Sequence, residues 1–97
     1  MTKLMLVEKL RAAIQDWAQK HAIELSLAEV NPTGIELDVQ VIVVARKGFE
    51  NWSEIDRDEN LYNHLKSVLN RESVVNMLYL ITMTEEEYDQ YDRVEVA

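Results

Sequence analysis

Residues 36–44 constrain the fold of this chain more than any other stretch. Successive side chains of an extended strand point to opposite faces. Alternate positions would therefore share one apolar face: Leu37, Val39, Val41 and Val43. The opposite face begins polar and becomes apolar at Ile42 and Val44. We expect such a strand in the middle of a sheet, with helices on one face and partial cover on the other.

The composition of the chain is that of one small globular domain, residues 1–97. Of the 97 residues, 47% are hydrophobic and 29% are charged. No run approaches the roughly 18 apolar residues of a membrane span, and no signal-peptide pattern is present. We therefore expect a cytoplasmic protein with no membrane association. The net charge of −8 repels phosphate groups, so nucleic acid is not the expected partner.

The first part of the chain predicts a helix followed by a strand. Apolar residues at spacings of three and four indicate a helix over residues 3–21, which Trp17 would anchor to the sheet. Alternation over residues 23–28 indicates a strand with Ile23, Leu25 and Leu27 on one face. Residues 31–34 read Asn-Pro-Thr-Gly, which is turn sequence. The two strands flanking this turn should form an antiparallel hairpin.

The second part of the chain predicts a helix, a strand and a final helix. Asp56 and Glu59 have the capping-box spacing, so a helix should begin there and run to about residue 71. Residues 74–84 indicate a third strand, parallel to the second because a helix connects them. Thr84 and Glu87 form another capping box, opening an acidic helix to about residue 91. The predicted fold is α+β, in the order α-β-β-α-β-α, with helices packed mainly on one face of a three-stranded mixed sheet.

This order and several residues resemble the BolA family, small domains whose fold is similar to class II KH. In that family a valine-rich strand leads to a Phe-x-Gly segment, an Arg-His-Arg triplet and an aliphatic-Tyr pair. The resemblance spans about residues 7–88, and its matching positions include Phe49, Arg57 and Tyr62. Asp58 stands at the position of the triplet's histidine.

The resemblance implies a partner and a cofactor that the residues here do not support. The family's C-terminal histidine binds an iron–sulfur cluster shared with a monothiol glutaredoxin, and Ile81 stands at that position. Isoleucine has no donor atom for iron, so no cofactor and no metal are expected. An iron–sulfur adaptor that takes its ligand from elsewhere, such as His64, is the alternative. KH-like RNA binding is the second alternative, although the Gly-x-x-Gly loop of KH domains is missing.

No catalytic residues are expected, and the chain is not predicted to be an enzyme. The chain has no cysteine nucleophile and no serine on a glycine-rich elbow. Asp56, Asp58 and Asn60 have the spacing that opens an EF-hand loop, but Leu61 stands where that loop requires glycine. We therefore expect no calcium site.

The third strand is apolar on both sides, and only one side can face the helices. The resemblance places Leu78 and Leu80 inward, because the family histidine lies on the partner-facing side. The predicted partner-binding residues on the open side are Ile42, Val44, Met77, Tyr79, Ile81 and Met83. An apolar patch of this kind marks an interaction site, unless the C-terminal helix folds over it. The sequence thus predicts a protein-interaction or adaptor domain that presents its open sheet face and third strand to a protein partner or, as a homodimer, to a second copy.

Overall fold

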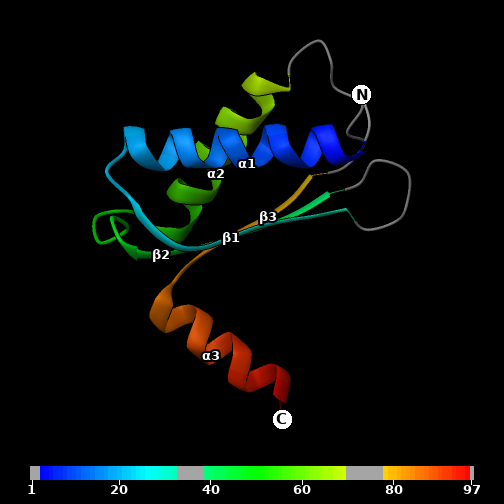
Figure 1. The fold of residues 1–97 in the computed structure, drawn as a ribbon. Coiled ribbons are helices and arrows are strands. Elements are labelled where there is room, and N and C mark those ends of the chain that lie inside the picture. The colour runs from blue at the N-terminus through cyan, green and yellow to red at the C-terminus, as the bar shows by residue number, and fades with distance from the viewer. Residues whose placement is uncertain (1–2, 33–38, 70–77, 97) are drawn as a thin grey trace.

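A computed structural model of the chain describes residues 3–32, 39–69 and 78–96. Its elements are α1 (Lys3–Lys20), β1 (Glu24–Pro32), β2 (Val39–Lys47), α2 (Glu54–Val68), β3 (Leu78–Thr84) and α3 (Glu85–Val96). The strand order is β1-β2-β3, with β1 antiparallel and β3 parallel to the central strand β2 (Figure 1). The predicted element order, mixed sheet and central strand are confirmed.

The helices divide between the two faces of the sheet. α1 and α2 cover one face, and α3 starts at the end of β3 and lies on the other side (Figure 1). The hydrophobic core lies between the sheet and the first two helices, and Leu80 packs against it as predicted. The inward residues of β2 in this core are Val39, Val41, Val43 and Ala45.

Trp17 is the largest fully buried side chain. Its ring contacts Phe49 and Trp52 at centroid distances of 6.2 and 6.1 Å. Its Nε1 donates a hydrogen bond of 2.9 Å to Oδ1 of Asn60. Trp17 therefore anchors α1 to α2 and to the segment after β2, in addition to packing in the core.

A β-bulge interrupts the predicted alternation of β1. Leu25 pairs with Ala45 and Leu27 pairs with Val44, so Ser26 is an extra residue with no partner in the register. Its Oγ donates to the Val44 carbonyl oxygen at 3.3 Å. Leu25 packs against the core, whereas Leu27 turns to the opposite face. The prediction that these two leucines share a face was wrong, because the bulge shifts the register by one residue.

The ends of several elements differ from the predicted ones; α3, for example, runs to Val96 and not to about residue 91. Ser53 is the N-cap of α2, and its side chain accepts a hydrogen bond of 3.1 Å from the Asp56 amide. The helix thus begins before Asp56, and the predicted capping box there was wrong. β1 continues through Pro32, although the sequence pattern placed this proline in the turn. The rest of the turn, the start of the second predicted strand and residues 70–77 lie outside the described residues.

Candidate functional site

The sheet face on the α3 side is the face on which the sequence predicted partner binding. The register of the strands places its side chains in three cross-strand rows. The rows are Leu27–Val44–Met83, Glu29–Ile42–Ile81 and Asn31–Gln40–Tyr79. The first row is wholly apolar, and each of the next two contains more polar residues. The face therefore changes from apolar to polar along the strands.

Two of the three residues in the apolar row are buried within the chain itself. Val44 is 1% exposed and Met83 is 5% exposed, although neither belongs to the core on the opposite face. α3 follows β3 directly and contacts both β2 and β3 on this side of the sheet (Figure 1). These two predicted binding residues are thus not accessible to a partner, because the final helix covers this end of the face.

The other end of the face remains partly accessible. Tyr79 is 50% exposed, and Ile42 and Ile81 are half-buried. With Gln40 and Met83 they border a hollow of about 140 Å³. Met77, the sixth predicted residue, lies outside the described residues. We call Ile42, Tyr79 and Ile81 the sheet patch.

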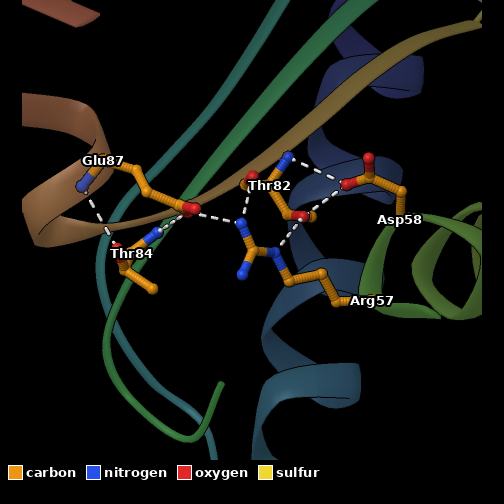
Figure 2. Close-up of polar contacts among 5 residues, drawn as sticks. All are labelled: Arg57, Asp58, Thr82, Thr84 and Glu87. Atoms are coloured by element: carbon orange, nitrogen blue, oxygen red, sulfur yellow. Dashed lines mark hydrogen bonds and ion pairs between the residues drawn. The ribbon is translucent and has the colours of Figure 1, made fainter. Parts of the chain in front are cut away.

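Arg57 connects α2, β3 and α3 from a buried position (Figure 2). It is 4% exposed, its Nε donates to Thr82 Oγ1 at 2.9 Å, and its Nη2 donates to the Thr82 carbonyl oxygen at 3.2 Å. Nη2 also donates to the Glu87 carboxylate. The guanidinium lies 5.0 Å from the ring centroid of Phe49, within cation–π range. This residue, which the family resemblance singled out, occupies a structural junction.

Asp58 contacts the same residue of β3 as Arg57. Its Oδ1 accepts a hydrogen bond of 3.1 Å from the Thr82 amide and another from the Thr82 hydroxyl. Thr82 is fully buried, and these contacts satisfy its hydroxyl, amide and carbonyl groups. Thr82 was not predicted as a site residue, although a threonine between two apolar residues of a strand indicates a buried polar partner.

Glu87 completes this polar cluster at the start of α3. The Glu87 amide donates to Thr84 Oγ1 at 3.1 Å, and the Thr84 amide donates to Glu87 Oε1 at 2.9 Å, which confirms the predicted capping box. The hydrogen bond from the Thr84 amide lowers the pKa of Glu87 below its usual 4.5; burial opposes this shift, and Arg57 adds to it. The sequence identified Glu87 as a cap but not as the partner of Arg57.

The other singled-out residues lie apart from these contacts. Tyr62 is on α2 and is 37% exposed, with the Lys66 ammonium 5.6 Å from its ring centroid. His64 is half-buried, and its Nε2 is buried without a hydrogen-bond partner. Of the four family positions, Phe49 contacts Arg57, and Arg57 and Asp58 both bond to Thr82. Tyr62 takes part in none of these contacts.

The described residues show neither a grouped metal site nor the family's ligand histidine. Among the described residues, no three His, Cys, Asp or Glu side chains are grouped so that they could hold a metal ion. The position of the family's ligand histidine carries the half-buried alkyl side chain of Ile81. Across the part of the chain that the structure describes, no helix is both long enough and apolar enough to cross a membrane.

The chain is similar to a known protein in its fold. No protein-family model and no curated protein matches its sequence. A solved structure, BolA1 from Arabidopsis thaliana, aligns with a TM-score of 0.64 over 84% of this chain and 94% of that chain, at 18% sequence identity. The chain therefore has a BolA-like fold, and the α+β fold implied by the resemblance is confirmed.

Proposed function

We propose that this chain is a protein-interaction or adaptor domain that binds another protein through the sheet patch. The half-exposed ring of Tyr79 is the observation that carries this proposal. It stands on β3 beside two partly exposed isoleucines, at the uncovered end of the face. Tyrosine offers an apolar ring together with a hydroxyl group, and it is enriched at protein interfaces.

The size of the sheet patch favours a transient complex with a different protein. Stable complexes bury about 800 Å² on each partner, whereas the patch has three apolar residues bordered by Glu29, Asn31 and Gln40. A homodimer would also bring together two chains that each carry a net charge of −8. We therefore propose a separate protein, not a second copy, as the partner.

Neither alternative function has comparable support. An iron–sulfur role would need a ligand in place of Ile81, and the buried Nε2 of His64 is poorly placed to reach a shared cluster. RNA binding would need free cations, but Arg46 lies 3.3 Å from a Glu24 carboxylate oxygen and 3.7 Å from one of Glu85. Binding of another protein through the sheet patch requires neither an iron ligand nor free cations, so we propose a role without catalytic or metal chemistry.

Affinity capture with a surface variant and a matched control tests this proposal. Tyr79→Asp places a charge in the sheet patch, and Leu4→Asp places the same charge on α1, where the side chain is 68% exposed. We expect the wild type and Leu4→Asp to retain the same partner and Tyr79→Asp to lose it. Light scattering of the purified chain should report a monomer. An identical set of captured proteins for all three chains would remove the support for the sheet patch.

A further inference from the structure

β3 is an edge strand of the sheet. Its hydrogen bonds show which of its residues direct their main-chain groups away from β2. The amide and the carbonyl of one strand residue point to the same side, and neighbouring residues alternate. The Thr82 amide and carbonyl both bond to side chains of α2, so these two main-chain groups point away from β2 (Figure 2). Leu80, two residues earlier, must also direct its amide and carbonyl outward.

The outer edge of β3 is covered at one end and open at the other. The Thr82 amide donates to Asp58, and the Thr82 carbonyl accepts from Arg57, both on α2. The Thr84 amide donates to the Glu87 carboxylate. No group among the described residues bonds to the outward amide or carbonyl of Leu80. Unpaired edge groups of this kind are a template for another strand.

A groove lies beside Leu80, between β3 and α2. It has a volume of about 360 Å³ and is lined by Ile55, Asp58, Glu59, Tyr62 and Leu80. Ile55 is 74% exposed and Tyr62 is 37% exposed, so α2 offers apolar surface to the solvent here. The two lining carboxylates make the groove acidic, and the Lys66 ammonium already lies against the Tyr62 ring. We call these five lining residues the edge groove.

We propose that the edge groove binds an extended, cationic segment of another protein, which adds as a strand to the outer edge of β3. Leu80 would supply the main-chain hydrogen bonds, as in other cases of strand addition. Aliphatic side chains of the segment would pack on Ile55 and Tyr62, and a lysine or arginine would lie near Glu59. The net charge of −8 favours approach of such a segment. This inference rests on the proposed role in protein binding but uses a different surface.

Amide exchange with a synthetic peptide tests the proposed strand addition. The probe is acetyl-Val-Thr-Lys-Thr-Val-Thr-amide, whose two valines and central lysine share one face of an extended strand, and its control replaces the lysine with glutamate. We expect saturating probe to slow exchange of the Leu80 amide by about tenfold or more, because a new hydrogen bond protects it. The glutamate peptide should not bind. Unchanged Leu80 exchange in the bound state, or equal binding of both peptides, would overturn the proposal.

Two charge reversals locate the site in the same titration. Glu59→Lys lies in the edge groove, whereas Glu8→Lys makes the same change on exposed α1. The first should weaken probe binding by about tenfold and the second should leave it nearly unchanged. Equal weakening by both variants would mean that only net charge matters, and it would contradict binding at the edge groove. Tyr79→Asp should not alter probe binding, so failure at the edge groove and failure at the sheet patch are separable.

Discussion

α1 and α3 lie on opposite faces of the same sheet but are attached to it by different forces. α1 is held by buried apolar side chains, among them Leu10, Ile14 and Trp17. α3 is held through its first turn, where Glu87 bonds to Thr84 and Arg57, and from there it extends away from the sheet (Figure 1). The difference explains why one face is closed and the other is covered only at the Val44 end.

The two attachments should respond differently to mutation and to pH. Burial of apolar surface does not depend on protonation, whereas a hydrogen-bonded carboxylate does. The comparison therefore predicts that changes at α1 reduce the stability of the whole domain, and that changes at α3 have smaller, pH-dependent effects.

The largest effect is expected at Trp17. Trp17→Ala should lower the free energy of unfolding by about 3–5 kcal/mol, because it leaves a cavity and deprives Asn60 of its donor. Urea denaturation followed by circular dichroism measures this loss. Leu4→Ala on the exposed side of α1 should change the same quantity by less than about 0.5 kcal/mol. A similar loss in both variants would contradict apolar anchoring by Trp17.

A smaller loss is expected at the junction between the helices. Arg57→Met should lower the free energy of unfolding by about 2–3 kcal/mol, because buried Thr82 loses two hydrogen bonds. Loss of the ion pair with Glu87 adds less to this cost than loss of a fully buried pair would, because the Glu87 side chain is 43% exposed. The same urea titration applies, and a variant as stable as the wild type would show that the junction does not hold α3.

The contribution of Glu87 should be smaller still and should depend on pH. Glu87→Gln should cost less than about 1 kcal/mol at pH 7, since solvent screens a half-exposed carboxylate. The folded-state pKa of Glu87 lies below 4.5, so its stabilisation is present above pH 4.5 and is lost as the pH falls through that folded pKa. The wild type and the variant should therefore converge in stability at acidic pH. Exposed Glu86→Gln is the control, and a wild-type advantage that persists or grows at acidic pH would refute this assignment.

The smallest effect on stability is expected at the sheet patch. Tyr79→Asp should change the free energy of unfolding by less than about 0.5 kcal/mol, because half of the side chain is already in solvent. Its thermal unfolding should match that of the wild type while partner binding is lost. A large loss of stability would mean that Tyr79 serves packing and not recognition.

Local rules predicted the parts of the fold that short segments decide. The hairpin, the parallel crossover and the Thr84–Glu87 cap follow from turn sequence, connection length and a three-residue spacing. The start of α2 was missed because Ser53 and Asp56 both satisfy the N-cap rule, and only the structure shows that Ser53 occupies the cap.

The remaining features depend on residues that are distant in the sequence. Nothing local to Ser26 indicates a bulge, because the bulge depends on the match between β1 and β2. The contact between Arg57 and Thr82 spans 25 residues. Val44 and Met83 are buried because α3 lies over them, and the position of α3 could not be read from the sequence. The sequence could therefore indicate the binding face but not which end of it stays open.

Photo-crosslinking from the sheet patch tests the central claim most directly. A benzophenone amino acid in place of Tyr79 should form a discrete covalent adduct with another protein in the native extract, and the same group in place of Leu4 should not. This result is predicted because, among the described residues, the face opposite α1 and α2 is most open at the row of Asn31, Gln40 and Tyr79. No adduct at position 79, or the same adducts from both positions, would contradict a docking role for this face.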